Sequence, residues 1–558
     1  MKRIKKIFNT EFSKISEAAI VLGFFTLMSQ ILAIFRDRLL AGNIGAEGTL
    51  DIYYSAFRIP DLLFTLGASL VSVSILMPFF KSELKKSKHD GKRFIHEIFT
   101  VFFIFITLSA IVCMIFMPTL AQYFFPGFDQ YQIQETIILS RVMLLSPIIL
   151  GISNLFATIT QAYKKFFVYA LAPVFYNLGI ILGIIFLFPR FGIVGLGYGV
   201  VIGALLHGLI QLPVIINHGL VPRLTSSIDW KHITQVVKHS LPRTITLSMS
   251  KIVFLIFVAI ASTLVEGSIS VFNLSYNLQS VPLAIIGVSY SVAAFPILVD
   301  FYNNQKHEKF MAHVMGPIRQ IIFWSLPIIA LFVILRAQIV RVILGTGNFD
   351  WADTRLTAAA LALFIISVVA QSIVLLLIRA YYAAGKTWKP LWITVVSSVI
   401  TVVFGYVFIT AYNSLPLLKS FFEGFLRISS VQGSSVIMLP LAYSIGMFIN
   451  VGLLWRSFKK DFDYSGHYGF SRSFVESLVA SMLIGGVTYF GLQVSDPYFS
   501  QETVLGVFGH GAISGIVGII VGASFLIIIK NQETMVFIAS IRKKFWKTKT
   551  TLKIQEDF

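Results

Sequence analysis

Residues 98–120 read IFTVFFIFITLSAIVCMIFMPTL, a run of 23 residues without one charged side chain. As an α-helix, about 20 such residues cross the roughly 30 Å of hydrocarbon in a bilayer. Equally apolar stretches occur at 166–188 and 506–529. In all, 56% of the 558 residues are hydrophobic and 13% are charged, whereas soluble chains carry about 25% charged residues. The sequence therefore predicts an all-α integral membrane protein.

The hydropathy pattern predicts about fourteen transmembrane helices, with both termini in the cytoplasm. In this orientation most of the 45 Lys and Arg residues fall in cytoplasmic segments, as the positive-inside rule requires. The basic N-terminus, 1–17, is expected to stay attached because its apolar run ends without a small-residue cleavage site. The predicted spans are 18–35, 53–80, 98–120, 136–160, 166–188, 191–216, 241–265, 268–299, 313–335, 356–378, 388–411, 434–455, 473–494 and 506–529.

The net charge of +19 would suggest nucleic-acid binding in a soluble protein. Here the charge follows membrane topology, so no nucleic-acid partner is expected. The loop 81–93 and the basic cytoplasmic tail 530–558 are expected to contact anionic membrane lipids.

Weak internal matches at a nearly constant offset indicate a duplication. Ala56-Phe57-Arg58-Ile59 precedes Ser275-Tyr276-Asn277-Leu278 by 219 residues, and Ala162-Tyr163 precedes Ala380-Tyr381 by 218. Six spans separate the copies, so the copies enter the membrane in the same direction and form parallel repeats. The predicted domains are an N-lobe at 18–216, a cytoplasmic linker at 217–240, a C-lobe at 241–456, and an added helix pair at 473–529. Gly195, Gly199 and Gly203 predict a smooth helix face for close packing.

Charged residues inside a bilayer are costly and usually face a cavity or a partner. Arg36, Asp37, Asp51, Arg58 and Lys251 are the candidate substrate-binding residues. Because guanidinium groups hold phosphate oxygens in pairs, a cation-rich cavity fits an anionic substrate. The alternative is that Asp37 and Asp61 only neutralise nearby arginines.

Motifs for catalysis are incomplete. Gly385-Lys386-Thr387 lacks the earlier glycine of a phosphate-binding loop, and His96-Glu97 lacks the second histidine of a zinc protease. The sequence therefore predicts no enzyme, no cofactor and no metal site.

Several stretches carry a family resemblance. Residues 29–37, SQILAIFRD, and 56–63, AFRIPDLL, resemble the opening of the MviN/MurJ lipid II flippases. Ala172-Pro173 with Asn177, Gln211-Leu212-Pro213, and 379–387, RAYYAAGKT, are similar to later signatures of this family. The resemblance implies the multidrug/oligosaccharidyl-lipid/polysaccharide exporter fold, with two six-helix lobes and a final helix pair that forms a groove for the lipid tail. It implies residence in the bacterial cytoplasmic membrane and a role in peptidoglycan synthesis.

The resemblance also implies flipping of an undecaprenyl-diphosphate-linked peptidoglycan precursor by alternating access, with Arg36 and Arg58 near the diphosphate. Membrane lipids and cell-wall synthesis proteins are the other expected partners. Uncharged residues replace the family's further cavity charges at Gln30, Phe64, Thr65, Ser69, Tyr276, Asn277 and Ser280. Two alternatives stay open: a flippase or exporter for another lipid-linked oligosaccharide or amphiphile, and a non-transporting envelope scaffold. Lys251 either replaces the metal ion that some relatives bind, which predicts sodium-independent transport, or binds substrate phosphate.

Overall fold

The computed structural model describes residues 15–70, 73–429, 431–462 and 470–545. Within these ranges the elements are all helices, which confirms the all-α prediction. The chain divides into two compact units, Met1–Ser270 and Val271–Phe558. Most of the predicted N-terminal segment 1–17, part of the loop before the thirteenth span, and residues 546–558 of the basic tail lie outside the described residues.

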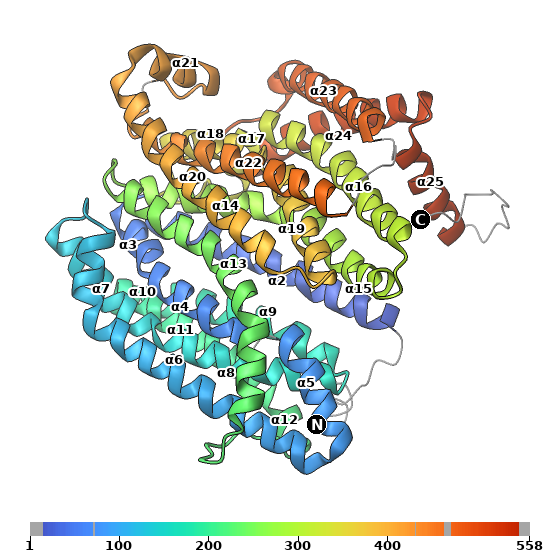
Figure 1. Cartoon of the computed structure of the whole chain (residues 1–558). Coiled ribbons are helices and arrows are strands. Elements are labelled where there is room, and N and C mark those ends of the chain that lie inside the picture. Colours follow the sequence, from blue (N-terminus) through green and yellow to red (C-terminus); the bar gives the residue numbers. More distant parts are fainter. Residues whose placement is uncertain (1–14, 71–72, 430, 463–469, 546–558) are drawn as a thin grey trace. The chain divides into compact units, whose positions relative to one another are not determined.

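The first unit contains the helices that hold the predicted charged cluster (Figure 1). They are α2 (Ile15–Ile44), α3 (Gly48–Ala56), α4 (Arg58–Leu70), α5 (Val73–Lys86), α6 (Lys88–Phe124), α7 (Gln130–Met143), α8 (Leu145–Ala162), α9 (Phe166–Leu182), η1 (Gly183–Leu187), α10 (Phe188–Phe191), α11 (Ile193–Leu209), α12 (Leu212–Asn217) and α13 (Trp230–Ser262).

Helix α14 (Ser268–Leu283) begins at the end of the first unit and continues into the second. The second unit also contains η2 (Ala284–Val288), α15 (Ser289–Asn303), α16 (His307–Ile334), α17 (Arg336–Ile343), α18 (Trp351–Ile365), α19 (Val368–Ala383), α20 (Trp388–Ser414), α21 (Pro416–Leu426), η3 (Ser434–Ile437), α22 (Met438–Asp461), α23 (Phe470–Ser495), η4 (Asp496–Tyr498), α24 (Val504–Ile528) and α25 (Gln532–Phe545).

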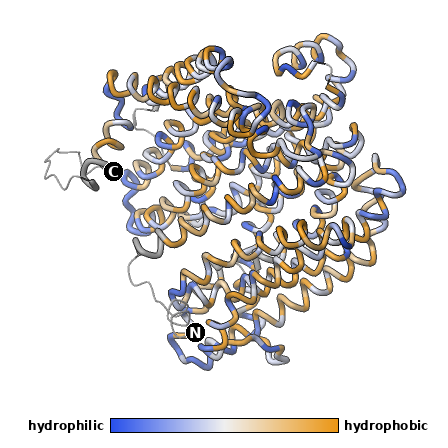
Figure 2. The backbone as a smooth tube through the Cα atoms, turned by 180° about the vertical axis from the view of Figure 1, so that it is seen from behind, coloured by the Kyte–Doolittle hydropathy of each residue, from blue (hydrophilic) through white to orange (hydrophobic). Residues whose placement is uncertain are grey.

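Among the described residues, 11 helices are long and apolar enough to cross a membrane, and the bent pair α18 and α19 would make twelve. Figure 2 shows the hydrophobic colour running along the long helices and the hydrophilic colour gathered at their ends. The two further predicted spans, 18–35 and 53–80, coincide with α2 and with α3 to α5. The total of fourteen remains a prediction.

Glycines bring α9 and α11 into close contact, as their spacing predicted. A Cβ on Gly179 of α9 would lie 2.3 Å from Cα of Gly203, and one on Gly183, the first residue of η1, would lie 2.4 Å from Cα of Gly199. No side chain fits between the two backbones at these points. The approach fixes α9, which carries Asn177 into the candidate site described below.

The N-termini of α3 and α14 are each capped by an acidic residue from the other segment: Glu266, just before α14, caps α3, and Asp51 of α3 caps α14. Glu266 accepts a hydrogen bond from the backbone of Gly48 at 2.8 Å, and Asp51 accepts from the backbone of Ser270 at 2.7 Å. The partners are 218 and 219 residues apart, which is the offset of the predicted duplication. Both contacts lie within the first unit and hold the start of α14 against α3, and the duplication remains a prediction.

In the second unit, α23 packs along α24 and against α16. Gly518 and Gly522 allow this contact, because a Cβ on each would lie 2.1 Å from Thr488 Oγ1 and 2.3 Å from Ile484 Cγ1. Helix α25 is joined to α16 by the buried ion pair of Arg319 and Glu533, with 2.9 Å between Nε and Oε1.

Candidate functional site

Arg36 is held in one orientation by two neighbours in the first unit. Its Nη2 and Nε lie 2.7 and 2.9 Å from the same carboxylate oxygen of Asp37. Its Nη1 donates to the side-chain oxygen of Asn177 on α9 at 3.3 Å. The Arg36 side chain is 20% exposed, so the guanidinium is ordered but remains accessible.

Asn177 connects α2 to α9. Its amide nitrogen donates to the hydroxyl of Ser29 at 3.1 Å and to the carbonyl of Pro173 at 3.2 Å. The carbonyl of Pro173 is one turn earlier on the same helix, so the side chain lies back along α9. Asn177 is therefore a positioning residue for Arg36.

Arg58 begins α4, directly after the break at Phe57 that separates α4 from α3. Its Nε donates to the carbonyl of Tyr54 at 3.0 Å, and its guanidinium carbon lies 5.5 Å from the ring centre of Phe254 on α13. This distance is within the range of a cation–π interaction.

One turn further along α4, Asp61 pairs with Lys251 of α13, with 2.7 Å between Oδ2 and Nζ. Arg58 and Asp61 are three residues apart, as are Lys251 and Phe254, so two consecutive turns of α4 face two consecutive turns of α13. The Lys251 and Asp61 side chains are 40% and 28% exposed. The pair is accessible, and Lys251 is the third predicted cation in the first unit, after Arg36 and Arg58.

A cavity of about 260 Å³ lies next to these residues. Asp61, Phe64, Pro173 and Tyr176 contribute to its lining. Asp61 belongs to the pair with Lys251, and Tyr176 precedes the Asn177 that holds Arg36. Arg36, Arg58 and Lys251 are not among its lining residues, so the cavity adjoins the charged cluster through Asp61 and Tyr176. Asn154, Ser146 and His207 add further polar side chains to its lining.

Asp51, the remaining candidate, lies elsewhere. Its side chain is 3% exposed, and its two oxygens accept hydrogen bonds from the backbone of Gly267, the backbone of Ser270 and the hydroxyl of Ser270. A carboxylate in this position stabilises a helix N-terminus. The structure thus gives Asp51 a role in fixing the start of α14.

The arrangement is suited to binding an anion. Arg36, Arg58 and Lys251 bring three positive charges, and Asp37 and Asp61 bring two negative charges. Within the described part of the chain, no group of three His, Cys, Asp or Glu side chains could hold a metal ion. Sequence reasoning had placed Asp61 only as a neutraliser of an arginine, and it had not identified Tyr176, Asn154 or His207.

Comparison with known proteins gives consistent matches. The model of the family described as "Lipid II flippase MurJ" matches residues 40–509. A lipid II flippase MurJ of Burkholderia cenocepacia is 23% identical over 481 residues, which cover 85% of this chain and 89% of that protein. The solved structure titled "Lipid II flippase MurJ, inward closed conformation" matches with a TM-score of 0.73 at 22% identity, over 92% of this chain and 99% of that chain.

An inward-facing multidrug resistance MATE transporter of the MOP superfamily shares the fold more distantly. Its TM-score is 0.62 at 16% identity, over 80% of this chain and all of that chain. The family model covers most of the sequence, including α4, α9 and α13, which carry Arg58, Asn177 and Lys251. The chain belongs to the lipid II flippase MurJ family.

Proposed function

We propose that this chain moves a diphosphate-linked glycan lipid of the lipid II type across the bacterial cytoplasmic membrane by alternating access. The observation that carries the proposal is the Arg36 guanidinium, oriented by Asp37 and Asn177 in a chain of this family. A lipid diphosphate offers several oxygens to a planar guanidinium, and such charge-assisted contacts are among the stronger hydrogen bonds in proteins.

Arg58 and Lys251 supplement Arg36. Phe64 lies in the lining of the adjacent cavity, where the family resemblance implies a further charge. This chain therefore has fewer cavity cations than the family resemblance implies. Arg58 of α4 and Lys251 of α13 are the cations that act in addition to Arg36. Lys251 is bound to Asp61, and a substrate phosphate could exchange with this carboxylate on the ammonium. This exchange would link substrate arrival to a change in the contact between α4 and α13.

The topology that accompanies this proposal has both termini in the cytoplasm, where the basic segments 1–17 and 530–558 would contact anionic lipids. The division into an N-lobe, a linker and a C-lobe, and a lipid-tail groove at the helix pair 473–529, are parts of the same proposal. So are contacts with cell-wall synthesis proteins, and the absence of catalysis by the chain.

The direct test reconstitutes the full chain in liposomes that contain lipid II, or a lipid-linked oligosaccharide with the same diphosphate and another glycan. Access of the headgroup to an added membrane-impermeant enzyme or probe reports flipping. We expect lipid II to be flipped faster than the second lipid. Equal rates would indicate that the diphosphate alone is recognised, and flipping of neither lipid would favour the scaffold.

A further inference from the structure

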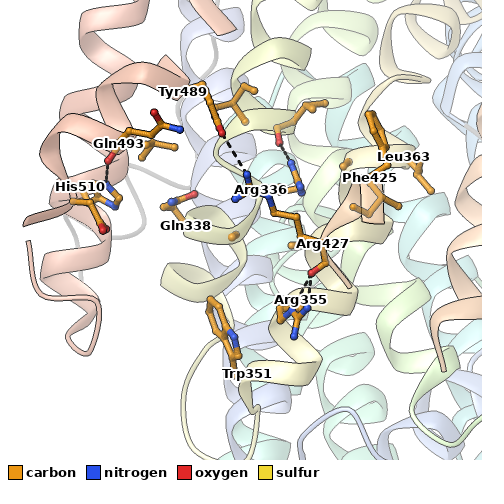
Figure 3. Close-up of a pocket in the computed structure, with 18 of the residues that line it drawn as sticks. Arg336, Gln338, Trp351, Arg355, Leu363, Phe425, Arg427, Tyr489, Gln493 and His510 are labelled. Atoms are coloured by element: carbon orange, nitrogen blue, oxygen red, sulfur yellow. Dashed lines mark hydrogen bonds between the residues drawn. The ribbon is translucent and has the colours of Figure 1, made fainter. Parts of the chain in front are cut away.

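A second cavity, of about 920 Å³, lies entirely within the second unit. It is formed where α16 ends and α17 begins, by α18, by the end of α21, and by α23 and α24. Figure 3 shows Arg336, Arg355 and Arg427 gathered on one side of it, with Phe425 and Leu363 beside them. Sequence analysis assigned no role to these three arginines.

Among the described residues, the three guanidinium groups donate hydrogen bonds to neutral oxygens. Arg336 donates to the carbonyl of Val333 at 2.8 Å, and Arg427 donates to the hydroxyl of Tyr489 at 3.3 Å. Arg355 donates to the carbonyl of Arg427 at 2.6 Å. In the ranges that the structure covers, none of the three arginines has an ion pair with a carboxylate.

One carboxylate, that of Asp496, belongs to the lining, and one of its oxygens accepts a hydrogen bond from Gln501. Three cations thus share the cavity with one anion. Burial, and to a smaller extent the nearby charge of Arg427, lower the pKa of Arg336. Both influences oppose the positive charge, and a bound anion would relieve them.

The cavity also contains an acceptor that has no donor. The side-chain oxygen of Gln338 is buried and lacks a hydrogen-bond partner among the described residues. Burying an acceptor without a donor is unfavourable, and a ligand that donates a hydrogen bond to it would remove this cost. A guanidinium cluster favours binding of an anion, whereas the Gln338 oxygen can accept a hydrogen bond from a donor such as a hydroxyl.

The cavity lies next to the end of a membrane-spanning helix. Arg336 lies two residues beyond Ile334, where the membrane-spanning α16 ends. On the neighbouring α21, Leu417, Phe421 and Phe425 are 87%, 62% and 68% exposed, and their spacing of four residues places them on one face. Phe425 also lines the cavity, so the apolar face of α21 continues into it. An exposed apolar stripe on a short helix at a membrane edge is typical of contact with lipid.

We propose that this cavity binds the phosphoglycerol headgroup of an anionic membrane lipid. Arg336 and Arg427 would hold the phosphate, a headgroup hydroxyl would donate to Gln338, and the acyl chains would lie along the apolar face of α21. Arg355 fixes the turn at Arg427, whose φ of +58° is strained for a residue with a side chain. The site contains none of the cations assigned to the substrate phosphate. Its lining shares Tyr489, Asp496 and His510 with the helix pair 473–529 proposed for the lipid tail, so in that part the inference rests on the proposed function.

The test is a titration of the full-length purified protein in detergent, with binding counted by native mass spectrometry. The probes are phosphatidylglycerol, phosphatidic acid, phosphatidylcholine and inorganic phosphate. We expect saturable binding of phosphatidylglycerol, weaker binding of phosphatidic acid because it lacks the headgroup hydroxyls, and little binding of the other two. R336Q and R427Q should each weaken phosphatidylglycerol binding at least tenfold, since each removes a charged contact to phosphate.

Two controls separate the site from general electrostatics and from misfolding. R341Q removes an arginine of the same helix, α17, that lies over the ring of the lining residue Trp351 but does not itself line the cavity, and it should leave the affinity unchanged. Q338L should remove the preference for phosphatidylglycerol over phosphatidic acid. R336Q should melt no lower than the unmutated protein, because it relieves charge repulsion.

The proposal is overturned if R341Q weakens binding as much as R336Q and R427Q do, or if neither cavity variant changes the affinity. If inorganic phosphate binds as tightly as phosphatidylglycerol, the site binds a free anion and the proposal of a lipid ligand is wrong. Arg36→Ala must leave this affinity unchanged, so failure here and failure of the transport proposal are distinguishable.

Discussion

Replacing Lys251 with methionine leaves the Asp61 carboxylate of α4 without its partner on α13. The two atoms are 2.7 Å apart, and the side chains are 40% and 28% exposed. Exposed ion pairs contribute about 0–1 kcal/mol, and breaking a buried pair costs about 3–5 kcal/mol. Solvent screens this pair partly, so we expect a coupling energy of about 1–2 kcal/mol.

The measurement is a double-mutant cycle of Lys251→Met and Asp61→Asn, read from reversible unfolding of the full chain in mixed micelles. Each single variant should have a lower free energy of unfolding than the unmutated protein. The double variant should lose less than the sum of the two single losses. The pair of Lys86 and Glu83, joined at 2.7 Å on an exposed turn, is the matched control and should show no measurable coupling. Additive effects at Lys251 and Asp61 would refute the reasoning that this pair joins α4 to α13.

Three other perturbations have outcomes that the structure defines. Gly203→Val should prevent the contact of α9 with α11 and abolish folding, because its Cβ would lie 2.4 Å from a backbone oxygen. The control Gly452→Val has no atom within 4 Å of the added Cβ and should fold normally. Thermal melting checks both variants, and equal stability would contradict the packing argument. Arg319→Met should leave the buried Glu533 without its ion-pair partner and lower the free energy of unfolding by about 3 kcal/mol. Release of α25 should appear as faster hydrogen exchange in this helix, and unchanged exchange would mean that the pair does not hold it. Transport in proteoliposomes should proceed equally with sodium or potassium as the only metal cation, and a dependence on sodium would remove the interpretation of Lys251 as a built-in cation.

The membrane fold could be predicted because hydrophobic length and charge asymmetry act locally along the chain. The glycine face on α11 could be predicted because four-residue spacing is a property of a single helix. Each of these features needs no knowledge of which helices are neighbours in space.

The contacts of the site depend on packing between distant helices and could be predicted only in part. The charged positions were identified, but the partner of Lys251 lies 190 residues away and is set by the register of α4 against α13. Asp51 was taken for a substrate ligand, although a buried carboxylate serves a helix start equally well. The arginines of the second cavity received no role from the sequence, because they come together only through the packing of α17, α18 and the end of α21.

Arg36 is the residue that we propose binds the transported anion. The most direct measurement compares lipid II flipping in proteoliposomes by the unmutated chain, Arg36→Ala, Arg36→Lys and the exposed control Arg190→Ala, all at equal reconstituted amounts. We expect Arg36→Ala to lose at least tenfold in rate, Arg36→Lys to retain part of it because it keeps the charge without the paired hydrogen bonds, and Arg190→Ala to be unaffected. Flipping by Arg36→Ala at the unmutated rate would contradict the account.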